Sequence, residues 1–555
     1  MVKPKIILIL IIVLAAVLRL VALNNFPAGL NADEASIGYN AYSLLQTGKD
    51  EYGSFLPLTF KSFGDWKPGL YFYMVMPFVA LFGLNEWAVR LPSALLGILT
   101  VYLTFLLGRE IFQHKIFGLW SAFLLAISPW HLQFSRGGWE TNVATFFITL
   151  GILLFIKGLK NYGLLLFSLI SFLASMYTYQ SPRLIVPVLG LMLLIFYYQP
   201  LIKAVRSLFL KERRFPSLKY KFKLVIIVVL LLILTLPLTG QFLSGTGSAR
   251  FTGLTFFSDQ GLISRIQQLR GEHENPKSKL SVSLHNKLTA FIPAFLGHYL
   301  DHFSGSFLFI NGDPLIRNKV PEVGQFYLIE FLFLTMGGIA VIKKQFAHKK
   351  ILLIWILVAP LASAMTYQTP HALRALNLVV PLTLIMGLGM GETINWLKSH
   401  WRILGVGLIT TVLVFEFVRF MQSYYIIYPQ RYPLAWEYGF SEMVQKLNQY
   451  ESKYEKVVIT DRFDQPYILV LFYKQYDPRK YQPQAALSPR DQFNFGTVRS
   501  FDKYEFHEAT LPELNSPGTL FIMSGEASPK NVKILDQVDF PSGEPAFVMI
   551  EGGQF

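Results

Sequence analysis

Long apolar runs alternate with short polar or basic segments along most of the chain. A bilayer core of roughly 30 Å needs about 20 apolar residues per helical span, and runs approaching that length recur as far as residue 420. The pattern predicts a mainly α-helical, polytopic membrane protein with about 11 to 13 transmembrane helices. We expect spans near Ile6–Leu23, Ala88–Leu107, Ile116–Pro129, Val143–Ile156, Gly163–Met176, Leu184–Tyr198, Leu224–Leu238, Phe326–Ile342, Ile351–Met365, Leu376–Ile394 and Leu404–Phe420.

Lysine and arginine gather in alternate loops between these runs. The positive-inside rule places such loops, and the N-terminus, on the cytoplasmic side. The remaining loops and the C-terminal segment then lie on the opposite, outer side. The basic loops contain Lys157 and Lys160; Lys203, Arg206, Lys211, Arg213, Arg214, Lys219 and Lys221; Lys343, Lys344, Lys349 and Lys350; and Lys398 with Arg402.

The apolar segment Leu70–Phe82 does not fit this scheme, because it is short for a span. Counting it as a full crossing would move every later loop to the opposite side of the membrane. Either the segment is re-entrant, or a compensating crossing lies near it.

The chain changes character after the last apolar run. Ser441–Tyr450 and Gln465–Lys474 have helical patterns, whereas Lys456–Ile459 has the pattern of a strand. We therefore expect a transmembrane domain over residues 1–421, with outer loops at 24–68 and 239–325, and a soluble α/β domain over residues 422–555.

Composition supports the membrane assignment and removes several classes of function. The chain is 52% hydrophobic and 15% charged, with a mean hydropathy of +0.40. There is no cysteine, which excludes disulfides, thiolate metal sites and cysteine nucleophiles but leaves the redox compartment undecided. The net charge is +15, but residues 422–555 carry 17 acidic and 13 basic residues, so the excess belongs to the loops of the bundle. This distribution indicates membrane topology rather than nucleic-acid binding.

The first outer loop contains the acidic pair Asp33 and Glu34 at the start of a predicted helix. Acidic residues there stabilise the helix dipole, so the pair is either a helix cap or a catalytic carboxylate held just above the bilayer. Tyr39 lies on the apolar face of this helix, which could rest on the membrane surface. Lys67 ends the loop and is either an interfacial anchor or a partner for an anionic headgroup.

Later outer loops contain further ionisable residues. His131, Arg136 and Glu140 are crowded between two apolar runs, where charges usually face a polar cavity. Arg136 and Glu140 could instead form an ion pair within one helix. His371 and Arg374 lie in the run Thr369–Arg374, and an arginine at an outer position suggests a phosphate partner.

The long outer loop contains a further group of ionisable residues. His298, Asp301 and His302 are metal ligands by residue type, but their spacing matches no specific site, so we predict no metal site and keep a divalent ion as an alternative. The sequence contains no Walker lysine loop, dinucleotide-binding glycine turn, His-Glu-x-x-His or Gly-x-Ser-x-Gly motif.

An ordered set of motifs resembles the GT-C membrane glycosyltransferases. The branch that is most similar holds the dolichyl-phosphate-mannose–protein mannosyltransferases and the lipid A aminoarabinose transferases. The resemblance covers about residues 6–420 and includes Lys-Pro-Gly where Lys-Pro-Pro is common. It rests on Leu18-Arg19-Leu20, Asp33-Glu34, Gly48, Lys67-Pro68, Phe82-Gly83, Ala88–Pro92, Ser128-Pro129 and Glu140.

The resemblance implies transfer of a sugar from a polyprenyl-phosphate donor to a protein, glycolipid or cell-envelope glycan, with inversion and without a cofactor. It implies that Asp33 is the general base or orients the acceptor, that Glu34 and Glu140 are further catalytic acids, and that Lys67 contacts the lipid phosphate. We add Arg374 as a second phosphate ligand from its outer position. Candidate substrate-binding residues are Tyr39, His131, Arg136 and His371.

Alternative functions are a lipid-linked sugar transporter or flippase, and a GT-C oligosaccharide transferase or ligase with a pyrophosphate-linked donor. A transporter should carry ionisable residues near mid-bilayer and internal repeats, whereas the informative charges here are at outer loop ends. The Asp-x-Asp pattern expected of oligosaccharyltransferases is absent, because alanine follows Asp33-Glu34.

Overall fold

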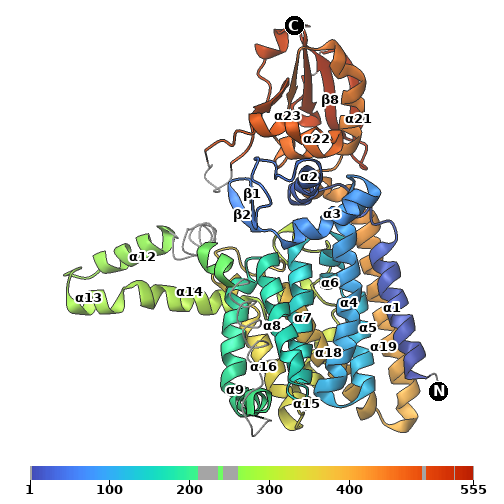
Figure 1. The fold of residues 1–555 in the computed structure, drawn as a ribbon, viewed down its shortest axis with the longest axis vertical. Coiled ribbons are helices and arrows are strands. Elements are labelled where there is room, and N and C mark those ends of the chain that lie inside the picture. Colours follow the sequence, from blue (N-terminus) through green and yellow to red (C-terminus); the bar gives the residue numbers. More distant parts are fainter. Residues whose placement is uncertain (1–2, 211–234, 242–259, 490–495, 530–531, 554–555) are drawn as a thin grey trace.

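The protein consists of a long helical bundle that carries a compact α/β domain on one end (Figure 1). This computed structural model describes residues 3–210, 235–241, 260–489, 496–529 and 532–553. The N-terminus lies at the opposite end of the bundle from the C-terminal domain (Figure 1). We call the end of the bundle that carries the C-terminal domain the domain end. Most of the expected span Leu224–Leu238 and the basic residues Lys211, Arg213, Arg214, Lys219 and Lys221 lie outside the described residues.

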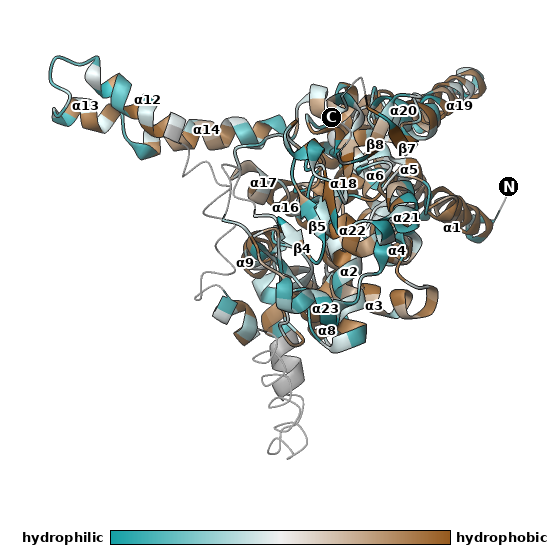
Figure 2. Ribbon diagram, turned by 90° about the horizontal axis from the view of Figure 1, so that it is seen from above, coloured by the Kyte–Doolittle hydropathy of each residue, from teal (hydrophilic) through white to brown (hydrophobic). Residues whose placement is uncertain are grey.

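Nearly all the other expected spans coincide with helices of the bundle, whose ribbons are largely hydrophobic (Figure 2). Five described helical segments are long and apolar enough to cross a membrane: Glu86–Phe112, Glu140–Gly158, Pro182–Lys203, Leu376–Trp396 and His400–Arg431. The expected class of polytopic membrane protein is confirmed, whereas the count of 11 to 13 spans stays a prediction. The bundle helices are α1 (Pro4–Leu20), α4 (Glu86–Phe112), α5 (Lys115–Ile127), α6 (Pro129–Arg136), α7 (Glu140–Gly158), α8 (Gly163–Thr178), α9 (Pro182–Leu210), α15 (Glu330–Lys343), α16 (Lys349–Val358), α17 (Leu361–Ala364), α18 (Val379–Trp396) and α19 (Ser399–Gln422).

The segment that did not fit the topology scheme forms a short helix, α3 (Leu70–Phe82). At 1.5 Å per residue its 13 residues span about 20 Å, less than the thickness of a bilayer core. It lies across the domain end, packed against α2 (Ala32–Thr47) and α4 rather than parallel to the long helices (Figure 1). This direction, rather than its length, distinguishes α3 from the equally short α5 of the bundle.

The first loop after α1 builds the junction between the bundle and the C-terminal domain. It contains α2 and a two-stranded antiparallel hairpin, β1 (Thr59–Ser62) and β2 (Asp65–Pro68). In the hairpin Phe60 pairs with Lys67. The Ser36 hydroxyl of α2 lies 3.1 Å from that of Ser62, which fixes the hairpin beside α2.

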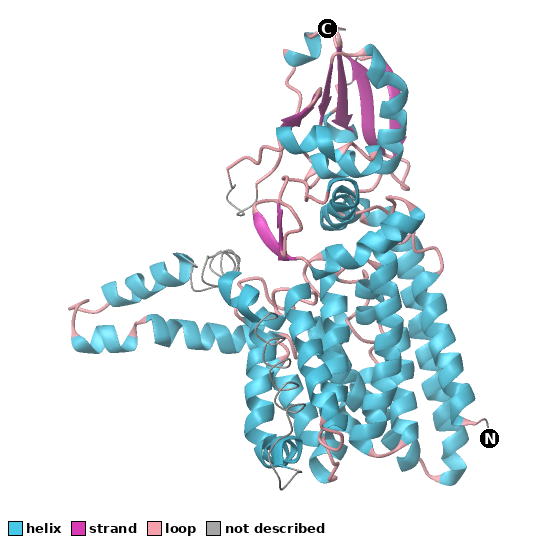
Figure 3. Cartoon of the chain, viewed as in Figure 1, coloured by secondary structure: helices cyan, strands magenta, loops and turns pink. Residues whose placement is uncertain are grey.

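The C-terminal domain contains a six-stranded mixed sheet with the order β4-β5-β3-β6-β8-β7. Apart from the small hairpin, the strands of the described chain gather in this domain (Figure 3). The predicted strand Lys456–Ile459 is β3, and the two predicted helices are α21 and α22. The domain contains α20 (Tyr428–Arg431), α21 (Phe440–Tyr450), β3 (Lys456–Ile459), α22 (Pro466–Lys474), α23 (Pro478–Tyr481), β4 (Ser500–Phe501), β5 (Tyr504–Phe506), β6 (Thr519–Ser524), β7 (Ile534–Asp539) and β8 (Pro545–Glu551).

Helix α2 is enclosed between the bundle and the C-terminal domain (Figure 1). A Cβ at Gly38 would lie 2.5 Å from Phe472 of α22 and 2.7 Å from Val89 of α4, so only glycine allows this approach. Tyr39 is fully buried, and its hydroxyl donates to the carbonyl of Tyr476 at 3.0 Å. The expectation that this face rests on the membrane surface is therefore wrong, because the C-terminal domain covers it.

A helical arm projects sideways from the bundle near the domain end (Figures 1 and 2). It contains α12 (Gln260–Gly271), α13 (Lys279–Leu284) and α14 (Lys287–Asp301). Along α14 the exposed residues Leu288, Ile292 and Leu296 recur every four positions and form one apolar stripe.

Candidate functional site

A polar cavity of about 470 Å³ lies at the domain end, between the first loop, the later loops of the bundle and the C-terminal domain. This volume is within the range of small-molecule sites. The cavity brings together Asp33 and Lys67 of the first outer loop with His371 and Arg374 of a loop far along the chain. Its polar and charged lining residues include Asp33, Asp65, Lys67, Arg317, Asn318, Gln368, His371, Arg374, Asp464 and Gln465.

Asp33 and Lys67 form an ion pair at this cavity. The Lys67 ammonium donates to Oδ1 of Asp33, and the side chains are 7% and 37% exposed, respectively. Helix α2 supplies the carboxylate and strand β2 supplies the amine, and the contact of Ser36 with Ser62 of the paired strand β1 holds the hairpin beside α2. An ammonium has three donors, so Lys67 can orient Asp33 and still contact an anion in the cavity.

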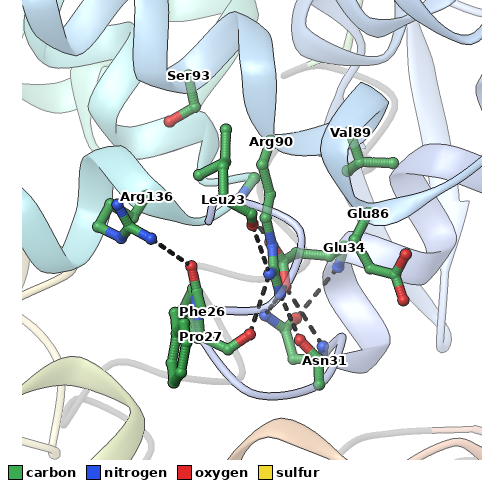
Figure 4. Close-up of polar contacts among 12 residues, drawn as sticks. Leu23, Phe26, Pro27, Asn31, Glu34, Glu86, Val89, Arg90, Ser93 and Arg136 are labelled. Carbon is green, nitrogen blue, oxygen red and sulfur yellow. Dashed lines mark hydrogen bonds and ion pairs between the residues drawn. The ribbon is translucent and has the colours of Figure 1, made fainter. Parts of the chain in front are cut away.

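Glu34 lies next to Asp33 in sequence but does not line the cavity. Successive residues of a helix point about 100° apart, and Glu34 is directed into the protein. It receives hydrogen bonds at 2.9 and 3.1 Å from the buried Arg90, at 2.7 Å from the amide of Gly138, and at 3.1 Å from Asn31 (Figure 4). With Asn31 it also forms the capping box of α2. Within the acidic pair, Glu34 is thus the helix cap and Asp33 is the carboxylate that lines the cavity.

Arg90 makes the start of α2 rigid. Besides Glu34, its guanidinium donates to the carbonyls of Leu23, Pro27 and Gly29, so it closes the whole turn between α1 and α2 (Figure 4). Both Arg90 and Glu34 have fully buried side chains. The position of Asp33 therefore depends on a buried ion pair immediately behind it.

Arg374 and Arg317 bring further positive charge to the cavity from two different loops. The carboxylate of Asp313 ties these loops together, because it accepts hydrogen bonds from the amide of Ala372 at 2.5 Å and from Asn318 at 3.1 Å. Arg374 itself donates to the Thr366 hydroxyl at 2.8 Å. Both guanidiniums thus have fixed positions at the cavity wall.

Arg317 links the bundle to the C-terminal domain. Its guanidinium lies 3.7 Å from Glu437 and 3.9 Å from Asp464. Although burial opposes it, the carboxylates of Glu437, Asp464 and Asp33 raise the pKa of Arg317 above its ordinary value. Burial raises the pKa of Glu437 to about 8, against the effect of Arg317. The cation is therefore firmly charged, whereas Glu437 titrates near neutral pH.

The second predicted loop supports the cavity from behind. Within α6, the Trp130 indole donates to the carbonyl of Ala372, and Gln133 donates to that of Arg317. His131 is fully buried against Arg19, and Arg136 donates to the last carbonyls of α1 and to Phe26 (Figure 4). Neither His131 nor Arg136 lines the cavity. They fix the start of the loop that carries Asp33.

The other predicted residues occupy different places. Glu140 begins α7 and is 7% exposed, but the adjacent Trp139, not Glu140, lines the cavity. Tyr39 is buried against the C-terminal domain, away from the cavity. His371 lines the cavity, and its ring nitrogen lies 3.8 Å from Asp313 and 3.4 Å from Asn318.

A buried glutamate lies close to the lysine of the ion pair. Glu51 is fully buried, accepts a hydrogen bond from Asn40 at 3.1 Å through Oε1, and has no partner for Oε2 among the described residues. Burial raises the pKa of Glu51 to about 8, although Asn40 and the charge of Lys67 oppose the rise. This carboxyl is thus held largely neutral at the junction with the C-terminal domain.

The comparisons with known proteins agree with this architecture. Residues 66–238 match the family model described as dolichyl-phosphate-mannose-protein mannosyltransferase. The chain is similar in structure to ArnT from Cupriavidus metallidurans bound to undecaprenyl phosphate. The structural alignment covers 98% of this chain and 97% of the ArnT chain, with a TM-score of 0.52 and 13% sequence identity. The chain has the GT-C glycosyltransferase fold. The resemblance expected from the sequence is therefore confirmed.

Two further comparisons were made. The alignment with an oligosaccharyltransferase from Archaeoglobus fulgidus, solved in the apo form, covers 85% of this chain and 63% of that chain, with a TM-score of 0.49 and 13% identity. A search of curated protein sequences found no match.

Sequence reasoning missed several lining residues, above all Arg317, Asp65 and Asp464. Arg317 breaks the positive-inside tendency in the same way as Arg374, so the same rule would have found it. Asp464 belongs to the tail, whose docking on α2 depends on tertiary packing. Within the described part of the chain no group of three His, Asp or Glu residues is placed to hold a metal ion. His302 instead contacts Ser363 at 2.6 Å and the carbonyl of His298 at 2.8 Å.

Proposed function

We propose that the protein is a membrane glycosyltransferase that transfers a sugar from a polyprenyl-phosphate donor to a hydroxyl group of an acceptor. The observation that carries this proposal is the convergence of Asp33, Lys67, Arg317 and Arg374 on one cavity at the end of the bundle. The bound lipid of the similar ArnT structure is undecaprenyl phosphate, which has the chemistry that this cavity suits.

The cations would act on the leaving group. When the bond between sugar and phosphate breaks, negative charge develops on the lipid phosphate, and fixed positive groups at that position lower the barrier. Lys67, Arg317 and Arg374 supply such groups from a hairpin and from two loops that Asp313 ties together. A guanidinium suits a phosphate particularly well because it can donate two parallel hydrogen bonds.

Asp33 would take the proton from the acceptor hydroxyl. With Asp33 as the base and the lipid phosphate as the leaving group, the acceptor oxygen can displace the phosphate directly, so we propose that the anomeric configuration inverts. Glu140 remains the alternative carboxylate, and no metal or organic cofactor takes part in the proposal. The acceptor is a protein, a glycolipid or a cell-envelope glycan.

We also propose that the domain end faces the extracytoplasmic side and that the N-terminus is cytoplasmic. The lysines at 157, 160, 343, 344 and 398 support this orientation, because the helix directions place them at the end of the bundle opposite the C-terminal domain.

The phosphate site is tested with matched pairs of variants. Lys67→Ala and Arg374→Ala should raise the KM for the polyprenyl-phosphate sugar by about tenfold or more, because a hydrogen bond to a charged group is worth roughly 1.5–3 kcal/mol. Lys61→Ala in the same hairpin and Arg431→Ala, an exposed residue paired with Glu322, are the controls. Unchanged donor kinetics in both cavity variants would refute the phosphate site.

A further inference from the structure

An open groove separate from the cavity runs between the bundle and the C-terminal domain. Its volume is about 970 Å³. It is bounded by residues 24–29 after α1, by the segment after α19 and by helix α21. Figures 1 and 2 show α21 beside the domain end of α1 and α4. No residue of this groove takes part in the phosphate site proposed above.

The groove is rich in amide side chains without protein partners. Its lining amides are exposed, and none of their side chains hydrogen-bonds another described residue. An amide offers both donors and an acceptor, which matches a sugar hydroxyl that donates and accepts. The amide residues are Asn24, Asn25, Gln430, Gln445 and Gln449.

Aromatic rings line the groove together with these amides. Phe26, Tyr425, Tyr438 and Tyr473 line the groove, and the rings of Phe26 and Tyr425 meet edge to face with centroids 4.8 Å apart. Aromatic rings present broad apolar faces, and those of tyrosine carry a polar edge as well. Such faces pack against the C–H faces of sugar rings while the amides bind the hydroxyls.

The groove has more acidic than basic side chains, whereas the cavity has three aspartates beside Lys67, Arg317 and Arg374. Glu86 and Glu442 line the groove together with Glu437, whose pKa is raised to about 8, and its lysine, Lys446, is held by Glu442 at 3.2 Å and by Asp536 at 2.9 Å. A phosphate or an anionic lipid headgroup would be repelled here. The groove is formed by helices and loops rather than by a strand edge that could pair with an extended peptide. A neutral carbohydrate fits all of these properties.

The groove lies close to the proposed base. Gly29 lines the groove and is separated from Asp33 by four peptide steps, so their Cα atoms are at most about 14 Å apart. On the other side, Glu437 of the groove lies 3.7 Å from Arg317 of the cavity. A chain of a few sugars in the groove can therefore reach the cavity.

We propose that this groove binds the carbohydrate part of the acceptor, a few sugar units away from the hydroxyl that is glycosylated. The proposal rests on the proposed glycosyltransferase function and narrows its acceptor to a glycan or a glycan-bearing molecule. It also gives the two sites different ligands: the cavity with its three cations binds the phosphate of the donor, and the acidic, amide-rich groove binds the neutral acceptor.

The test uses the full-length protein in nanodiscs and an array of neutral bacterial oligosaccharides. The best-bound oligosaccharide is then titrated against the double variant Gln445→Ala/Gln449→Ala, whose residues lie on one exposed face of α21. Loss of their hydrogen bonds should weaken binding about tenfold, at the roughly 0.5–1.5 kcal/mol of each bond. The control is Asn448→Ala, an exposed amide of α21 that does not line the groove and should bind normally.

The outcomes separate this proposal from the proposed function. Absence of oligosaccharide binding, or equal binding by the Gln445→Ala/Gln449→Ala and Asn448→Ala proteins, would overturn the groove proposal, even if Asp33→Asn abolished transfer. Preferential capture of unglycosylated peptides would overturn it as well. If the groove variant loses oligosaccharide affinity while Asp33→Asn transfers sugar normally, the groove stands as a carbohydrate site and the catalytic proposal fails.

Discussion

Replacing Asp33 by asparagine separates catalysis from folding. The amide keeps the shape of the side chain and can still accept a hydrogen bond from Lys67, but it cannot take a proton at neutral pH. General base catalysis contributes about 10²–10⁴-fold, so turnover should fall by that factor, which corresponds to roughly 3–5 kcal/mol in the activation barrier. The ion pair with Lys67 is partly exposed on the Asp33 side, so the free energy of unfolding should change by no more than about 1 kcal/mol.

The neighbouring Glu34→Gln substitution should behave in the opposite way. Glu34 and Arg90 are fully buried partners, and removal of one charge from such a pair costs roughly 3–5 kcal/mol of stability. The variant should therefore unfold at a clearly lower temperature. Molecules that remain folded should still transfer sugar, because Asp33 is unchanged.

The assay measures release of polyprenyl phosphate from the donor in the presence of envelope extract, together with the thermal unfolding of each purified variant. An Asp33→Asn protein with more than a tenth of the wild-type rate would refute the assignment of the base. If Glu140→Gln abolished transfer in the same experiment, the base would be Glu140. Equal losses of stability in the Asp33 and Glu34 variants would contradict the division of the acidic pair.

The remaining predictions concern pH, topology and metals. Because the pKa of Glu51 is raised to about 8 in the folded protein, folded chains hold more protons than unfolded ones between about pH 4.5 and 8, and stability falls as pH rises through this window. Glu51→Gln should flatten that decline in a series of melting temperatures; an equally steep decline would contradict the buried carboxyl. In the cysteine-free background, Ser542→Cys should react with an impermeant maleimide on intact cells and Asn161→Cys should not, and the reverse result would invert the proposed topology. Prolonged EDTA treatment should leave transfer within twofold of the untreated rate, and restoration of lost activity by a divalent cation would show a metal requirement.

The bundle was largely predictable because its pattern is local. Each apolar run requires a helix in lipid, since a helix satisfies its own backbone hydrogen bonds. The short α3 was less predictable: the sequence left Leu70–Phe82 either re-entrant or compensated by another crossing, and the structure places it across the domain end. The fold class therefore followed from composition and periodicity.

The cavity was predictable only in part. Asp33, Lys67 and Arg374 stood out because they are charged residues at unusual positions of a membrane chain. The separation of Asp33 from Glu34 was not predictable, because it depends on Arg90, which is 56 residues away from Glu34 in sequence. The place of Asp464 in the cavity was not predictable either, since the tail reaches the cavity through its packing on α2.

The contribution of Asp464 and Gln465 to the cavity has a consequence for biogenesis. Chains fold from the N-terminus as they are synthesised, domain by domain, so the early bundle helices can insert before these residues exist. The wall that Asp464 and Gln465 form is missing until the tail has docked, through Phe472, against Gly38 of α2. A nascent or truncated chain thus has lipid-embedded helices but an incomplete cavity, and the proposed site forms only once the C-terminal domain has docked.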